Sequence, residues 1–229
     1  MIDIHTHVLP LVDDGSDNLK ASIAMLEESC KQGVTDLILT PHLRGEFNKT
    51  PTQIESTFIS FCQQVKQQNI DINLYLGQEV YISKSFKSLF DSDRFLTMNN
   101  SNYVLIEFDY QNDFDIAETV YELTRRDYKP IVAHFERYEY ADLSVAREIK
   151  SLGGYIQINA SSIVGKTKKS YIKKIIKLIK EGCVDFIASD VHDFRENFMK
   201  KSADFISRKF GKKVANELFY ENARKIIKK

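Results

Sequence analysis

The sequence has few of the features that mark exported, membrane-bound or nucleic-acid-binding chains. Its three cysteines are odd in number and widely spaced, which argues against a disulfide framework and predicts a reducing, cytoplasmic location. Basic and acidic residues number 32 each, so the net charge of zero excludes wholesale attraction to nucleic acid or to an anionic membrane. The N-terminus has no basic segment followed by an apolar one, and no run of about 18 apolar residues occurs. We therefore expect a soluble, unexported chain without membrane insertion.

The chain is long enough to bury one full core. Its 229 residues are 43% hydrophobic, and no repeat, low-complexity stretch or linker divides them, so residues 1–229 are predicted to form a single domain. Short β-rich runs alternate with longer segments of helical periodicity, which predicts an α/β fold: a parallel sheet with helices outside, as an open doubly wound sheet or as a barrel. The seven predicted strands lie within residues 1–5, 36–42, 72–79, 103–108, 130–137, 155–159 and 184–192.

Helices are predicted between these strands and after the last one. The helical pattern covers residues 19–30, 51–68, 114–126, 142–151, 168–181, 196–209 and 212–227. Residues 80–102 are the one long excursion, and we expect them to form a short helix and a loop that could overhang a site.

All five histidines lie at or just past the C-terminal end of a predicted strand. His5 and His7 are one residue apart, and residues i and i+2 of an extended segment point to the same face, so their imidazoles lie side by side. Taken singly, any of the five could be an ordinary hydrogen-bonded residue at a strand end. Their shared position, at the edge where parallel sheets and barrels build sites, indicates a metal centre instead. The other three are His42, His134 and His192.

Acidic residues accompany the histidines at this edge. Glu79 ends the third run, Glu107 ends the fourth, Asp190 stands two residues before the last histidine, and an Asp-Asp pair follows the opening His-x-His. Glu107 could alternatively be a strand-end carboxylate that faces solvent. Imidazoles and carboxylates in these numbers can hold two or three divalent ions. We expect manganese first, with iron, zinc or magnesium as alternatives.

Several motifs together resemble a known family. The stretches "IDIHTH", "TPH", "GQEVY", "AHFERY" and "SDVH" occur in the order and near the spacings of the polymerase and histidinol phosphatase superfamily, the PHP fold. The opening "DIHTHVLPLVDDGSDNLKASIAMLEESCKQGV", with "LIEF" and "QINASSI", is similar to its bacterial branch of manganese-dependent protein-tyrosine phosphatases from capsular and exopolysaccharide loci, such as CpsB, CapC and YwqE. The resemblance spans nearly the whole chain. It implies a distorted seven-stranded (β/α)7 TIM-like barrel with three metal ions at its C-terminal rim.

The resemblance also implies which residues hold the ions. Glu79 would bridge two of them. Relatives with histidinol phosphatase activity commonly have a histidine where Glu107 stands, so this carboxylate favours the tyrosine-phosphatase interpretation. The ligands would be divided among the three ions as His5, His7 and Asp190; Glu107 and His134; and His42, His192 and an acid of the "VDDG" stretch, for which we choose Asp14 over Asp13.

Arginines near the rim are candidates for binding a phosphate, because the planar guanidinium group matches two phosphate oxygens. Arg137, three residues after His134, stands where the family has an essential arginine; a surface ion pair with a neighbouring glutamate is the alternative. Arg195 follows His192 by three residues, a shorter spacing than the family pattern leads us to expect. Arg44 is a third candidate and could equally be a solvated loop residue.

The resemblance implies hydrolysis of phosphotyrosine, with a tyrosine-phosphorylated protein as partner, in particular the tail of a bacterial kinase that controls polysaccharide synthesis. Clustered divalent ions create a hydroxide nucleophile near neutral pH, so no protein nucleophile is required. Consistent with this, no cysteine is followed by an arginine six residues on, as thiolate phosphatases need. Rim aromatics such as Tyr110 could flank the phosphotyrosine ring or simply pack. Two alternatives stay open: a small-molecule phosphomonoesterase such as histidinol phosphatase, and a non-catalytic metal-bound module that recognises phosphorylated partners.

Overall fold

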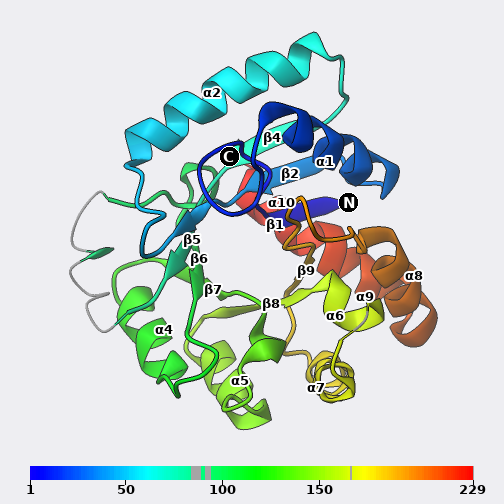
Figure 1. Cartoon of the computed structure of the whole chain (residues 1–229). Coiled ribbons are helices and arrows are strands. Elements are labelled where there is room, and N and C mark those ends of the chain that lie inside the picture. The colour runs from blue at the N-terminus through cyan, green and yellow to red at the C-terminus, as the bar shows by residue number, and fades with distance from the viewer. Residues whose placement is uncertain (84–88, 91–93, 166, 229) are drawn as a thin grey trace.

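A curled parallel sheet forms the centre of the protein, and helices cover its outside (Figure 1). The computed structural model describes residues 1–83, 89–90, 94–165 and 167–228. Within them the strands pair in the orders β1-β2-β4 and β3-β5-β6-β7-β8-β9, and every pair is parallel. The strands are β1 (Ile2–Thr6), β2 (Asp36–Leu39), β3 (His42–Leu43), β4 (Asn73–Leu76), β5 (Glu79–Tyr81), β6 (Tyr103–Glu107), β7 (Lys129–Val132), β8 (Tyr155–Asn159) and β9 (Phe186–Ala188).

The α/β class with a parallel sheet is confirmed, but the described residues form nine strands in two sheets rather than the seven strands expected. The difference arises because two predicted strands are each broken in two. The run at 36–42 breaks before Pro41, which has no amide hydrogen to donate to a neighbouring strand. The run at 72–79 breaks at Gly77, where a Cβ atom would lie 3.2 Å from the Cα atom of Met98. At both breaks the chain passes from one sheet to the other.

The two sheets also meet where the first strand lies beside the last. The amide of Asp190 donates a hydrogen bond to the His5 carbonyl at 2.9 Å, and the amide of His7 donates to the Val191 carbonyl at 3.0 Å. The C-terminal ends of β1 and β9 are therefore neighbours, although about 180 residues separate them in the sequence.

The helical predictions are confirmed in position, with two differences. Helix α6 (Ala160–Val164) was not predicted, and the predicted helix at 212–227 is divided into α9 (Lys212–Asn216), a π-helical turn (Glu217–Glu221) and α10 (Asn222–Ile227). The short helix predicted within 80–102 falls in part on residues 84–88 and 91–93, which lie outside the described residues. The other long helices are α1 (Leu19–Lys31), α2 (Pro51–Gln67), α4 (Ile116–Thr124), α5 (Leu143–Ser151), α7 (Lys169–Lys180) and α8 (Met199–Phe210).

The core has two layers because the sheet is buried on both faces. The larger cluster joins the outward-facing strand residues to the surrounding helices. The smaller cluster fills the inside of the curled sheet, where Ile2, Ile4 and Ile131 meet Ala223 and Ile226 of α10. Helix α10 therefore closes one end of the curl, and the polar strand ends occupy the other.

No helix in the described ranges is both long enough and apolar enough to cross a membrane. The three cysteines, Cys30, Cys62 and Cys183, are free thiols.

Candidate active site

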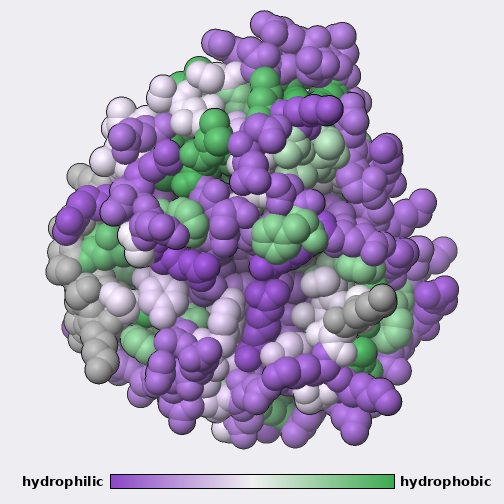
Figure 2. All heavy atoms as spheres, viewed as in Figure 1, coloured by the Kyte–Doolittle hydropathy of each residue, from purple (hydrophilic) through white to green (hydrophobic). Residues whose placement is uncertain are grey.

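The predicted metal ligands lie together at the C-terminal ends of the strands, on the face where hydrophilic side chains gather around the centre of the molecule (Figure 2). Six strands or the loops that follow them contribute these side chains: three come from β1 and its loop, two follow β9, and β3, β5, β6 and β7 or their loops supply one each. All of these side chains are buried except that of Asp14, which is 40% exposed. The nine residues are His5, His7, Asp14, His42, Glu79, Glu107, His134, Asp190 and His192.

Glu79 is the centre of the cluster. Its Oε2 atom lies 3.2 Å from Nε2 of His5, 3.3 Å from Nε2 of His7 and 2.9 Å from Nδ1 of His42. Its other oxygen, Oε1, lies 3.0 Å from Nε2 of His134. One carboxylate thus contacts four imidazoles from the ends of three strands, β1, β3 and β7, which is the position that a bridging ligand requires.

Among the residues that the structure describes, three groups of ligand atoms are close enough to hold a metal ion, with all atoms of a group within 4.8 Å of one another. His7 and His42 each belong to two groups, so neighbouring groups share ligands. The Nε2 atom of His134 lies 3.7 Å from Glu107 Oε1, which brings this histidine to the third group as well. The groups are His5, His7 and Asp190; His7, Asp14, His42 and His192; and His42, Glu79 and Glu107.

Asp13 and Asp14 contact different ring nitrogens of the histidines. Oδ2 of Asp13 lies 2.7 Å from Nδ1 of His7 and accepts the backbone amide of His42 at 3.0 Å, so Asp13 lies behind the imidazole and directs its Nε2 inward. Asp14 Oδ1 lies 3.4 Å from Nε2 of His42 and 3.5 Å from Nε2 of His192. This geometry favours Asp14 as the ligand and gives Asp13 the part of a positioning residue.

The electrostatics of the cluster suit a cation. Burial raises the pKa of Glu79, but His5 and His42 outweigh it and hold this pKa well below its usual range. Burial and the nearby His7 lower the pKa of His192 to about 3, so its imidazole is neutral, the form that binds metals. Glu79 Oε2 and His42 Nδ1 are both fully buried and make no hydrogen bond of acceptable geometry, although they are in contact. Two ligands of one ion have this relation, since the ion takes the place of the missing proton.

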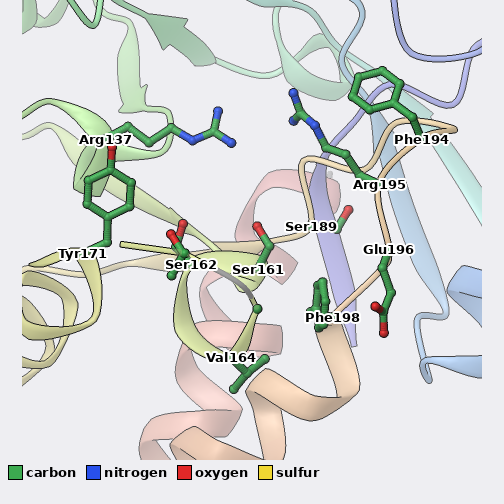
Figure 3. A pocket seen from close by; sticks show the side chains of 12 residues that line it. Arg137, Ser161, Ser162, Val164, Tyr171, Ser189, Phe194, Arg195, Glu196 and Phe198 are labelled. Atoms are coloured by element: carbon green, nitrogen blue, oxygen red, sulfur yellow. The ribbon is translucent and has the colours of Figure 1, made fainter. Parts of the chain in front are cut away.

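Two arginines share one carboxylate beside the cluster. Nη1 of Arg195 donates to Asp190 Oδ2 at 2.9 Å, and Nη1 of Arg137 lies 3.3 Å from the same oxygen. Figure 3 shows the two guanidinium groups pointing toward each other across a cavity of about 800 Å³, above the hydroxyl groups of Ser161 and Ser162. Arg137 is therefore not engaged in the surface ion pair that was its alternative, and Arg195 reaches the site despite its short spacing.

Comparisons with known proteins agree with this geometry. The family described as "Capsular polysaccharide synthesis, CpsB/CapC" matches residues 1–228. The chain belongs to the CpsB/CapC family. "Tyrosine-protein phosphatase CpsB" of Streptococcus agalactiae serotype V is 34% identical over 239 residues, which cover 100% of this chain and 98% of the relative. "Tyrosine-protein phosphatase YwqE" of Bacillus subtilis is 29% identical, with 100% of this chain and 92% of YwqE covered.

Solved structures extend the comparison. A chain from the crystal structures of YwqE from Bacillus subtilis and CpsB from Streptococcus pneumoniae, described as unique metal-dependent tyrosine phosphatases, matches with a TM-score of 0.91. It is 27% identical, and 99% of this chain and 94% of that chain are covered. A lactonase from Listeria monocytogenes matches at 10% identity and a TM-score of 0.59, which shows that the two proteins share a fold.

Tyr110, at the rim of this CpsB/CapC chain, makes contacts with the site that the sequence did not predict. The hydroxyl of Tyr110 donates to Glu107 Oε1 at 2.8 Å and accepts from Nη1 of Arg137 at 3.3 Å, and its ring lies 5.8 Å from the Arg137 guanidinium carbon. Burial and Glu107 raise the pKa of Tyr110, so the hydroxyl keeps its proton at neutral pH. Arg44 also donates to Glu107, at 3.3 Å. The sequence indicated Tyr110 only as one of several rim aromatics, without its contacts with Glu107 and Arg137.

Lys174 of α7 holds the turn that carries Arg137. Its Nζ donates to the carbonyls of Phe135 at 3.0 Å and of Tyr138 at 2.8 Å. Burial lowers the pKa of Lys174 to about 8, against the opposing effect of Glu136, while the unfolded chain keeps the ordinary value near 10.5. The unfolded state therefore binds more protons between pH 8 and 10.5, and the free energy of unfolding should rise with pH across this window.

We predict that Lys174→Met removes this rise. Between pH 8 and 10.5, the unfolding free energy of the wild type should gain on the order of 2 kcal/mol relative to the variant. Urea unfolding of both proteins in chelator, at a series of pH values, measures the difference. Parallel pH profiles for the two proteins would contradict the prediction.

Gly15 is required by the close approach of the loop after β1 to His7. A Cβ atom at this position would overlap the carbonyl oxygen and the Cβ of His7. We predict that Gly15→Ala destabilises the protein by roughly 3 kcal/mol or more, because backbone must move to relieve the overlap. Gly45→Ala is the control, since Gly45 also lies in a rim loop but a Cβ there would have no atom within 4 Å, and only its φ of 50° opposes the change, at about 1 kcal/mol. Chemical denaturation measures both, and equal losses would argue against the overlap.

Proposed function

We propose that this chain is a metal-dependent protein-tyrosine phosphatase. The observation that carries the proposal is the arrangement of one buried carboxylate, Glu79, among four imidazoles, beside two arginines that share Asp190. The full-length relatives support it, since they are named tyrosine-protein phosphatases. The combination of a multi-ligand cluster with adjacent guanidinium groups suits a phosphate ester as substrate.

The donor set suits two or three divalent ions, with manganese as the expected metal. Bound there, such ions would supply positive charge against the phosphate and make water a nucleophile near neutral pH. Glu79 would bridge two of them, as its contacts with several ligand imidazoles suggest. The further ligands would be His5, His7 and Asp190 for one ion, Glu107 and His134 for a second, and Asp14, His42 and His192 for a third.

Arg137 and Arg195 would bind the phosphate oxygens. Each uses one nitrogen on Asp190, which fixes the guanidinium group and leaves further N–H groups free to donate. Tyr110 contacts Arg137 with both its ring and its hydroxyl, which helps to hold the guanidinium group in place. The leaving group is a phenolate, whose parent phenol has a pKa of about 10, so it departs without a strong general acid.

The substrate that we propose is a tyrosine-phosphorylated protein, in particular the tail of a bacterial tyrosine kinase that regulates capsular or exopolysaccharide synthesis in the cytoplasm. The family description supports the polysaccharide context. A protein segment needs an open site, and the guanidinium groups border a cavity of about 800 Å³ that a single phosphate does not fill.

Initial rates on a phosphotyrosine peptide, a phosphoserine peptide and histidinol phosphate test the proposal, with metal-stripped protein refilled with manganese. We expect the phosphotyrosine peptide to be hydrolysed fastest, and no hydrolysis in chelator. A preference for histidinol phosphate would be consistent with the metal centre but would contradict the proposed substrate. Manganese binding without hydrolysis of any of the three esters would indicate a non-catalytic module that recognises phosphorylated partners.

A further inference from the structure

Two amide side chains of β8 form a buried line between candidate ligands of three other strands. Gln157 and Asn159 point to the same face of the sheet, as residues i and i+2 of an extended strand do. Both are 0% exposed. β8 itself contributes none of the proposed ligands, so the proposed function assigns no role to these two residues. A buried amide is retained only where its hydrogen bonds are made, and the contacts of this pair are specific.

The orientation of the Gln157 amide follows from a neighbour that can only donate. The backbone amide of His134 lies 2.8 Å from one side-chain atom of Gln157, which must therefore be the acceptor Oε1. The nitrogen Nε2 then faces Asn159, and the atom that it meets at 2.8 Å must be the acceptor Oδ1.

The orientation of Asn159 is fixed independently by a neighbour that can only accept. Oδ2 of Asp190 lies 2.7 Å from the side chain of Asn159, so the contacting atom is the donor Nδ2. Asn159 Oδ1 must then face Gln157, in agreement with the other end of the line. Donation therefore runs in one direction, from Gln157 through Asn159 to Asp190.

His5 is the residue on which this direction acts. Its Nδ1 lies 3.1 Å from Gln157 Oε1, which has no hydrogen to donate, so Nδ1 must carry the ring proton. Nε2 is then the nitrogen that faces His7 Nε2 at 3.1 Å and Glu79 Oε2 at 3.2 Å. A neutral imidazole binds a metal through the nitrogen without the proton, so His5 is set to offer Nε2 to the cluster.

We propose that Gln157 and Asn159 form an amide relay that selects the Nδ1-protonated form of His5 and orients Asp190, so that both present ligand atoms to the same ion. The relay also holds the backbone of His134, which has a left-handed φ of 35° at the point where β7 gives way to the turn. One pair of amides thus aligns ligands from β1, β7 and β9. The proposal rests on the metal centre of the proposed function and assigns positioning roles to residues that are not ligands.

Nitrogen NMR of metal-free, ¹⁵N-labelled protein tests the relay, at a pH where the His5 ring is neutral. In the wild type we expect the proton of His5 on Nδ1. Gln157→Met keeps the length of the side chain but removes both polar groups, and it should lose this preference. Gln157→Glu keeps an acceptor at Oε1 and should retain it. The affinity for manganese, measured by calorimetry, should fall about 10- to 100-fold in Gln157→Met.

Gln78→Met is the matched control. Gln78 is also a fully buried glutamine, in the connection between β4 and β5, but its Oε1 accepts from the backbone amide of Leu96 and not from an imidazole. This variant should keep the His5 tautomer and the manganese affinity of the wild type. A wild-type His5 protonated on Nε2 overturns the proposal, as does an unchanged tautomer and affinity in Gln157→Met. Neither readout requires hydrolysis. A protein with the expected tautomer but no phosphatase activity would therefore support the relay and contradict the proposed function.

Discussion

Glu79→Gln should lower kcat on a phosphotyrosine peptide about a thousandfold and reduce the amount of manganese bound. The carboxylate contacts four imidazoles, and an amide at its place offers one weak acceptor and one donor that would face ring nitrogens. Metal ions contribute several kcal/mol of charge stabilisation to the transition state, and a loss of about 4 kcal/mol corresponds to a factor of roughly a thousand. Metal content by atomic emission and steady-state kinetics measure the two effects together.

The control is Glu148→Gln, the same change at an exposed position of α5, which should leave metal content and kcat unchanged. A Glu79→Gln protein that keeps its full metal content and more than a tenth of wild-type kcat would remove Glu79 from the centre of the site.

Arg137→Lys should lower kcat by about 100- to 1,000-fold while leaving the manganese content unchanged. Lysine keeps the positive charge but loses the planar fork that matches two phosphate oxygens, and it cannot contact Asp190 and the Tyr110 ring at once as the guanidinium does. Arg137 is not one of the proposed metal ligands. Arg137→Lys should therefore lower the activity without loss of bound manganese, whereas Glu79→Gln should lower both.

Arg208→Lys, at an exposed position of α8, is the control for the substitution itself. If Arg137→Lys lost manganese along with activity, the arginine would be maintaining the cluster through Asp190 and its assignment to the phosphate would fail.

The position of the site could be predicted from the sequence because it depends on one periodic feature. Parallel strands end at a common edge, so histidines placed after successive strands must meet there, whatever the details of the loops. His42 and His134 are brought together in this way, although each had an ordinary structural interpretation when taken alone. The acids at strand ends, Glu79 and Glu107, follow the same rule.

What the sequence could not give depends on contacts between distant segments. Asp13 and Asp14 have the same chemistry at adjacent positions, and only the path of the loop past His42 distinguishes the positioning residue from the candidate ligand. In the sequence, Lys174 is one of many lysines on a helix predicted to be solvated. Only the structure shows its contacts with Phe135 in the neighbouring turn. The break at Gly77 likewise follows from its approach to Met98, which no local pattern records.

The contact between the C-terminal ends of β1 and β9 also sets an order of events during synthesis on the ribosome. His5 and His7 are made 185 residues before Asp190 and His192, respectively. A nascent chain therefore exposes its first histidines long before their partners exist, and two of the three ligand groups stay incomplete until Asp190 and His192 have been made. A chain released before Asp190 has been made therefore cannot complete either of these two groups.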